Sequence, residues 1–140
     1  MSLDATNEKR VSTLHPPFQA LARAFLNECE KAGHRLRVTF GHRSLDEQAV
    51  LYAQGRTAPG PIVTNAKPGQ SAHNYGSAID VVFLTKDGKA DWNGPWKDIG
   101  AIGEKLGLVW GGNFKTIVDR PHFEWAHWRE LRAKASAPKT

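Results

Sequence analysis

A polar turn leads directly into an apolar strand near the middle of the chain. Residues 71–84 read Ser-Ala-His-Asn-Tyr-Gly-Ser-Ala-Ile-Asp-Val-Val-Phe-Leu. The apolar run from Ile79 to Leu84 predicts a buried strand. A carboxylate at Asp80 is costly there unless it is paired or binds a metal ion. Because Gly76 allows a sharp bend, His73 in the turn and Asp80 in the strand can converge on one point.

A second polar segment lies nearer the C-terminus, where residues 119–125 read Asp-Arg-Pro-His-Phe-Glu-Trp. Strand alternation places His122 and Glu124 on one face. Two histidines and one carboxylate, with one position left for water, are typical of a catalytic zinc site. On residue types alone the alternatives stay open, since His73 could be structural and Asp80 could pair with an arginine.

Upstream of the central stretch, the patterns predict a helix followed by a strand. Residues 16–32 begin with two prolines and repeat apolar residues at helical spacing, and Gly33 supplies the stop. Residues 35–40 alternate polar and apolar, which predicts a strand with Leu36, Val38 and Phe40 facing the core. Residues 1–12 are polar and are expected to form a loose lead-in.

A capping box predicts the next helix. Ser44 is followed three residues later by Glu47, so a helix should run from about Leu45 to Gln54. Residues 56–70 hold three prolines and further turn-forming residues, which predicts a long loop of the kind that often carries function.

Downstream of the central stretch, short strands alternate with one helix. Asp87-Gly88 signals a tight hairpin turn, and Pro95 suits the beginning of a helix. Helices and hairpin-linked strands without a regular βαβ repeat predict an α+β fold. The further strands are expected at 90–92, 108–110 and 122–125, and a frayed tail at 135–140.

Composition limits the classes of protein to consider. The chain has 140 residues, 40% hydrophobic and 24% charged, which predicts one globular domain over residues 1–140. Cys29 is the single cysteine, so an internal disulfide and a cysteine-rich zinc site are excluded. The net charge of +5 favours an anionic partner such as nucleic acid, a membrane surface or bacterial wall polymer, and simple solubility explains it equally well.

Targeting signals are missing from the sequence pattern. The N-terminal residues have no apolar segment after a basic start, and no apolar run approaches the roughly 20 residues that span a bilayer. We therefore expect a chain made in the cytoplasm without stable membrane insertion, which another component must release if its target lies outside the membrane.

The two polar segments together closely resemble the zinc peptidoglycan peptidases. That family joins D-alanyl-D-alanine carboxypeptidases and dipeptidases with the L-alanyl-D-glutamate endopeptidases of bacteriophage lysis. The similarity covers roughly residues 35–125 and extends to the segments 41–57, 59–69 and 110–114. The resemblance implies the Hedgehog/D-Ala-D-Ala peptidase fold, a small antiparallel sheet flanked by helices, with no separate wall-binding domain.

The resemblance also implies roles for individual residues. His73, Asp80 and His122 match the Zn²⁺ ligands, Asp119 matches the general base, and Arg43 matches the arginine that stabilises the oxyanion. The carboxypeptidase branch usually has Glu at the position of Asp119, whereas the phage endopeptidases have Asp. The resemblance therefore points to the L-alanyl-D-glutamate bond. An ordinary aspartate is a poor acid at neutral pH, so we expect the site to raise the pKa of Asp119.

Four further residues are expected to contact substrate or support the ligands. Ser71 and Asn74 can bond to local backbone, and His42 lies beside the presumed oxyanion arginine. Glu124 either orients a ligand histidine or competes with Asp119 as the base. At Asn113, related sequences often have Asp, and this departure concerns substrate contacts more than the metal.

Several alternatives to the endopeptidase stay open. One is a D-Ala-D-Ala carboxypeptidase or dipeptidase with the same site, and another is a non-catalytic module that binds cell wall. A nucleic-acid-binding domain is suggested by the basic pI alone and is disfavoured, because no stacking motif is present. The compact chain resembles a phage lysis enzyme (endolysin) that acts as a monomer on host peptidoglycan after release. Anionic wall or membrane contacts could involve Arg129, Arg132, Lys134 and Lys139, although a solvated surface explains these residues equally well.

Overall fold

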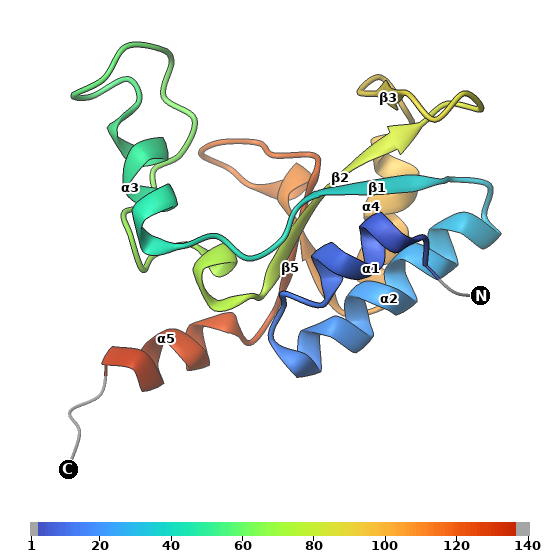
Figure 1. Cartoon of the computed structure of the whole chain (residues 1–140), viewed down its shortest axis with the longest axis horizontal. Coiled ribbons are helices and arrows are strands. Elements are labelled where there is room, and N and C mark those ends of the chain that lie inside the picture. The colour runs from blue at the N-terminus through green and yellow to red at the C-terminus, as the bar shows by residue number, and fades with distance from the viewer. Residues whose placement is uncertain (1–2, 137–140) are drawn as a thin grey trace.

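The computed structural model describes residues 3–136 and confirms the α+β fold, with a small antiparallel sheet and flanking helices (Figure 1). The α-helices are α1 (Ala5–Val11), α2 (Pro16–Lys31), α3 (Leu45–Ala53), α4 (Trp96–Lys105) and α5 (Trp128–Ser136), and the 3₁₀ helices are η1 (Ala72–Tyr75) and η2 (Gly111–Asn113). The strands are β1 (Leu36–Phe40), β2 (Ala78–Leu84), β3 (Ala90–Asp91), β4 (Leu108–Trp110) and β5 (His122–Trp125).

Strand β2 lies at the centre of the sheet. The strand order is β1-β2-β5-β4, and β3 pairs with the far end of β2. In the antiparallel ladder between β2 and β5, Asp80 is directly opposite His122. Side chains directly opposite each other in such a ladder lie within contact distance. The register of the sheet therefore brings together two residues that are 42 positions apart in sequence.

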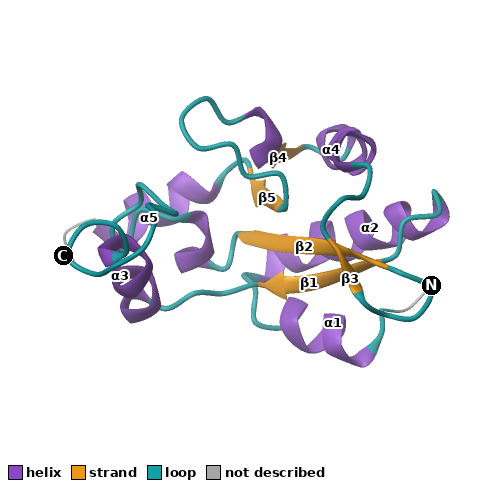
Figure 2. Cartoon of the chain, turned by 90° about the horizontal axis from the view of Figure 1, so that it is seen from above, coloured by secondary structure: helices purple, strands orange, loops and turns teal. Residues whose placement is uncertain are grey.

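Helices cover the sheet and leave one end of it to the cleft. Helices α1, α2 and α4 pack around the strands, whereas α3 and α5 lie beyond the end of the sheet at which β2 begins (Figures 1 and 2). The core between α2, α4 and the sheet is aromatic, and the rings of Phe25 and Phe123 lie 4.3 Å apart. This core supports the strands from which the polar side chains project.

Three features of the fold differ from the sequence-based expectations. Residues 5–11 form α1 rather than a loose lead-in, and Val11 is fully buried. Phe40 is 56% exposed rather than in the core, because the register between β1 and β2 shifts after Val38. The expected tail begins inside α5, which continues to Ser136. Residues 137–140, including Lys139, lie outside the described part.

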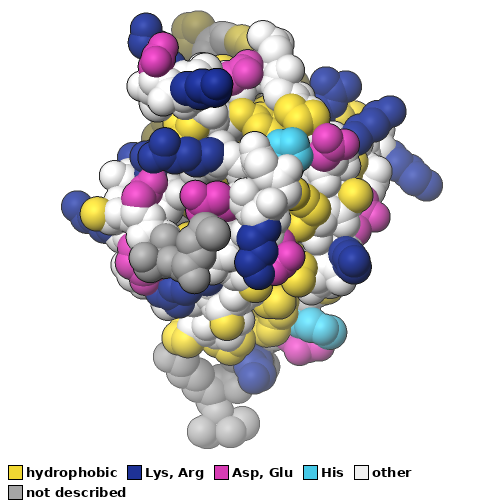
Figure 3. Space-filling view, turned by 90° about the vertical axis from the view of Figure 1, so that its right-hand side faces the viewer, with side chains coloured by type: hydrophobic (Ala, Val, Ile, Leu, Met, Phe, Trp, Pro, Cys, Tyr) yellow, Lys and Arg dark blue, Asp and Glu magenta, His cyan; other side chains and the backbone are white. Residues whose placement is uncertain are grey.

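The surface shown in Figure 3 has charges of both signs. Lysine and arginine side chains on this face are interspersed with aspartate and glutamate side chains, around a band of hydrophobic residues. No helix between residues 3 and 136 is both long enough and apolar enough to cross a bilayer.

Candidate active site

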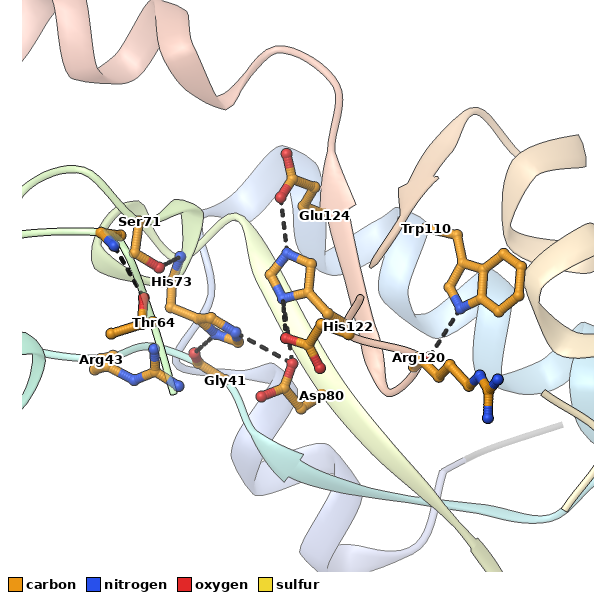
Figure 4. Close-up of polar contacts among 12 residues, drawn as sticks. Gly41, Arg43, Thr64, Ser71, His73, Asp80, Trp110, Arg120, His122 and Glu124 are labelled. Carbon is orange, nitrogen blue, oxygen red and sulfur yellow. Dashed lines mark hydrogen bonds and ion pairs between the residues drawn. The ribbon is translucent and has the colours of Figure 1, made fainter. Parts of the chain in front are cut away.

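Three side chains of metal-ligand type meet where β2 begins. One donor atom from each of His73, Asp80 and His122 lies within 4.8 Å of the others. Asp80 Oδ1 is 3.3 Å from His73 Nε2 and 3.2 Å from His122 Nδ1 (Figure 4). Both imidazole rings are buried. The structure thus brings together the three residues that the sequence analysis singled out.

The turn that carries His73 is built by its neighbours. The hydroxyl of Ser71 accepts a hydrogen bond from the backbone N–H of His73, and the side chain of Asn74 accepts one from the N–H of Ser71. Asn74 also donates to the carbonyl oxygen of Arg43 at 3.0 Å. Gly76 ends the turn with φ of 61°, where a Cβ would lie 2.6 Å from the backbone nitrogen of His15. Ser71 and Asn74 therefore shape the turn, and Asn74 joins it to the segment of Arg43.

The outer nitrogen of each imidazole ring has an acceptor. His73 Nδ1 lies 2.8 Å from the carbonyl oxygen of Gly41, and His122 Nε2 lies 2.7 Å from Glu124 Oε1. Since a carbonyl or carboxylate oxygen can only accept a hydrogen bond, these contacts place an N–H on the outer nitrogens. The inner nitrogens then present lone pairs toward Asp80. Two imidazole nitrogens and one carboxylate oxygen, with outer nitrogens held in this way, fit a catalytic zinc site.

Glu124 is bonded on both of its oxygens. Besides His122, it accepts a hydrogen bond from the indole N–H of Trp128 at 2.7 Å, and all three side chains are buried. These contacts are those expected of a carboxylate that orients a ligand histidine. Sequence reasoning did not predict the contribution of Trp128, whose partner lies on a different element.

The proton equilibria of the cluster are coupled. Burial acts to raise the pKa of Asp80, but hydrogen bonds to His122 and His73 lower it well below its ordinary value of 3.8. Burial acts to lower the pKa of His122, but its hydrogen bonds to Asp80 and Glu124 raise it to about 9. Without a bound metal ion, a buried carboxylate and a buried imidazolium thus compensate each other's charge. Binding of a metal ion requires the inner nitrogen of His122 to lose its proton, because only a neutral imidazole has a lone pair to donate.

Asp119 lies beside the cluster without being part of it. Its Oδ2 is 4.0 Å from His122 Nδ1, and its side chain is partly exposed to the cleft. Burial, and then the negative charge of Asp80, raise the pKa of Asp119 above its ordinary value of 3.8. The raised pKa agrees with the sequence-based expectation for this residue.

Arg43 is held at the cleft by a buried glutamine. Its guanidinium donates to Gln48 Oε1 at 3.1 Å, and Gln48 donates to the carbonyl oxygen of Ala66 at 2.8 Å. Gln48 is fully buried and was missed in the sequence analysis. The available signal was its helical spacing, since Gln48 shares a face of α3 with Leu51, which lines the cleft.

A cleft of about 620 Å³ is lined by seven of the candidate residues: Arg43, Ser71, His73, Asp80, Asp119, His122 and Glu124. Asn74 lies behind it and supports the turn. His42 is exposed and borders a separate hollow between α1 and β1, so the structure does not place it with the other candidates. Asn113 is exposed and donates to Glu104 Oε1 at 2.8 Å, away from the cleft lining. The rest of the cleft wall is formed by Leu51 of α3, residues 63–66 and 70–72, residues 114, 116 and 117, and the α5 residues Trp128, Arg129 and Arg132.

Comparisons with known proteins agree with this geometry. Residues 64–125 match the family described as D-alanyl-D-alanine carboxypeptidase. The chain is 42% identical over 123 residues to the peptidoglycan L-alanyl-D-glutamate endopeptidase CwlK of Bacillus subtilis (strain 168), covering 81% of this chain and 74% of CwlK.

Two solved structures share the fold. The L-Ala D-Glu endopeptidase ChiX of Serratia marcescens has a TM-score of 0.65 and 23% identity, with 95% of each chain covered. The vancomycin resistance D,D-pentapeptidase VanY, solved as the E175A mutant in complex with Zn(II), has a TM-score of 0.62 and 12% identity, with 87% of this chain and 79% of VanY covered.

Proposed function

The chain belongs to the D-alanyl-D-alanine carboxypeptidase family of peptidoglycan peptidases, and we propose that it is a zinc-dependent endopeptidase that cuts the L-alanyl-D-glutamate bond of the peptide stem. The observation that carries the proposal is the cluster of His73, Asp80 and His122, with Asp119 beside it, in an open cleft. The 42% identity to CwlK supports the choice of bond.

The side chains around the cluster have complementary tasks in this proposal. His73, Asp80 and His122 would hold Zn²⁺, which supplies Lewis acidity that activates water and polarises a carbonyl group near neutral pH. Asp119 accepts a proton from the attacking water and returns it to the leaving amine. A raised pKa suits both steps, because it makes the carboxylate a stronger base toward water and keeps it protonated for longer until the amine leaves.

Arg43 acts on the carbonyl oxygen of the scissile bond, whereas Asp119 acts on the attacking water. Its guanidinium is positioned by Gln48 and by the backbone bond between its own N–H and the carbonyl oxygen of His73, which is 3.0 Å long. A prearranged cation stabilises the negative charge that develops on the carbonyl oxygen. Ser71 lines the same cleft and is placed to contact the peptide.

We further propose that the enzyme serves in host-cell lysis by a bacteriophage. This role is supported by the resemblance of residues 119–123, Asp-Arg-Pro-His-Phe, to the phage endopeptidase branch. In that role the enzyme acts as a monomer on the host wall after release from the cytoplasm. The family description favours a D-Ala-D-Ala carboxypeptidase as the second candidate, with the same residues in the same tasks.

The test is digestion of purified peptidoglycan by the zinc-loaded protein, with the new ends identified by mass spectrometry. New L-alanine carboxyl ends and D-glutamate amino ends are expected, and a chelator or His73→Ala should abolish them. Release of D-alanine instead would assign the chain to the carboxypeptidases. Zinc binding without any product would contradict the enzymatic proposal and favour a wall-binding module.

A further inference from the structure

Two arginines of α5, Arg129 and Arg132, line the cleft. The guanidinium carbons of Arg129 and Arg132 lie 4.6 and 5.2 Å from the ring centre of Trp128. Neither arginine forms an ion pair with a carboxylate between residues 3 and 136. Stacking on an indole restricts a guanidinium in orientation while leaving its N–H groups available.

The platform under these arginines is connected to the candidate metal ligands. Trp128 is 4% exposed, stacks on Tyr75 at 6.0 Å and donates to Glu124, which in turn bonds to His122. The positions of the arginines relative to the reacting centre are therefore set by packed and hydrogen-bonded side chains. A surface helix without these contacts would leave the two charges free to move.

Charge is distributed unevenly within the cleft. The carboxylates Asp80, Asp119 and Glu124 line it together with Arg43, whereas Arg129 and Arg132 line it from α5. Arginine is well suited to bind carboxylates, because its planar group offers paired N–H donors. The α5 wall therefore fits a substrate with a carboxylate close to the scissile bond.

The proposed substrate has such a group. In the peptide stem the chain continues through the γ-carboxyl of D-glutamate, so its α-carboxylate is free and lies next to the bond that is cut. We propose that Arg129 and Arg132 form a subsite that binds this α-carboxylate on the leaving-group side. The inference rests on the proposed function and names the feature of the substrate that the enzyme selects.

The test uses two matched synthetic muropeptides, one with D-glutamate and one with D-isoglutamine, whose α-carboxylate is replaced by a carboxamide. Both carry L-lysine amide next, so the α-carboxylate is the single carboxylate of the peptide. We expect the wild type to prefer the D-glutamate substrate by about tenfold or more in kcat/KM, as for loss of a charge-assisted hydrogen bond. The double variant Arg129→Gln, Arg132→Gln should lose that preference, mainly through KM.

Matched controls separate binding from folding. Lys97→Gln removes an exposed positive charge on α4, away from the cleft, and should keep the preference. Zinc content and thermal unfolding of each variant report whether the site and fold are intact. A third muropeptide, with D-isoglutamine followed by diaminopimelate, tests whether a carboxylate on the next residue is bound instead.

Each outcome decides between the alternatives. If the double variant lost kcat/KM equally on both matched substrates, the inference would be overturned. The arginines would then serve only to pack on Trp128, and the proposed function would remain intact. Rescue by the diaminopimelate carboxylate would also overturn the assignment to D-glutamate. If the wild type cut neither muropeptides nor peptidoglycan, the proposed function itself would fail.

Discussion

At the scale of single residues, Glu124 is more deeply buried than the other two carboxylates of the site, Asp80 and Asp119. It is buried, and its two oxygens accept hydrogen bonds from two different donors, the ring of His122 and the indole of Trp128. A carboxylate can accept both bonds, because it has no donor hydrogen of its own when ionised. The bonds hold the ring of His122 in one orientation, with Nδ1 toward Asp80.

Glu124→Gln should weaken zinc binding by about 10- to 100-fold, the usual cost of losing a partner that orients a ligand. In the amide an NH₂ group replaces one of the two acceptor oxygens, so either His122 or Trp128 faces another donor. Competition with a chromophoric chelator measures the affinity, and kcat at saturating zinc should largely survive.

Asp119→Asn should show the reverse pattern, with zinc binding kept and kcat lowered by about 10²- to 10⁴-fold, as for loss of a general base. Glu130→Gln is the control, because Glu130 is exposed on α5 and, within residues 3–136, forms an ion pair with His127 alone. If Glu124→Gln abolished turnover at full zinc occupancy while Asp119→Asn spared it, the base would be Glu124.

Cys29 gives a prediction that depends on pH. Burial raises the pKa of its thiol from an ordinary 9.0 to about 12. Because the folded-state pKa is the higher one, the thiol's contribution to stability is fully present below about pH 9 and is lost as pH rises toward 12. At about pH 8 a thiol reagent should therefore react slowly with the native protein and fully in denaturant. Fast native labelling would show that α2 opens locally.

At the scale of elements, two glycines set how closely α4 approaches the sheet. A Cβ at Gly100 would lie 2.6 Å from the ring of Trp110, and one at Gly103 would lie 2.8 Å from the ring of Phe123. The ring of Trp110 is itself anchored, since its N–H donates to the carbonyl oxygen of Arg120 at 2.8 Å. Close packing of α4 thus supports β4 and β5, the strands that position His122.

Gly100→Ala tests which of two opposing effects is larger. Helix propensity alone favours alanine by about 1 kcal/mol, whereas overpacking a core typically costs about 1–3 kcal/mol. We expect a net decrease in the free energy of unfolding, measured by urea denaturation. Lys97→Ala, exposed on the same helix, should change it little. A more stable Gly100→Ala protein would mean that Trp110 can move aside.

At the scale of the whole molecule, the sheet and its covering helices form one part and the cleft forms the other. Strand β2 joins them, because its buried end lies in the core and its first residues carry Asp80. Edge strand β1 is completed by α1, since Asn7 donates to the carbonyl oxygen of Leu36 and accepts from the N–H of Val38, both at 2.9 Å. The Asn7 side chain thus takes the place of a neighbouring strand.

Asn7→Ala should lower the free energy of unfolding by about 1–3 kcal/mol, because it leaves buried backbone groups of β1 without partners. The zinc affinity of the folded protein should not change, since the cleft lies beyond the other end of the sheet. Thr6→Ala, at an exposed neighbouring position of α1, is the control. Equal unfolding curves for the two variants would show that water replaces the Asn7 contacts.

Much of the fold and of the candidate site follows from local patterns. The capping box of Ser44 and Glu47 forms as predicted, because its partners are three residues apart. Strand β2 and the turn that precedes it are also set by residues close together in sequence. His73 and Asp80 could therefore be recognised as a pair. The family resemblance added Arg43 and Asp119, whose roles stay predictions.

The sequence by itself determined the types of the elements between residues 16 and 125, the cost of burying Asp80 in an apolar strand, and the donor types that suit zinc, but it did not predict helices α1 and α5. Only the tertiary structure decided that His122 lies opposite Asp80, that Phe40 turns outward, and that Trp128 holds Glu124. The reason is physical. Capping and periodicity act over a few residues, whereas strand register and side-chain packing arise when segments far apart in sequence are buried against each other.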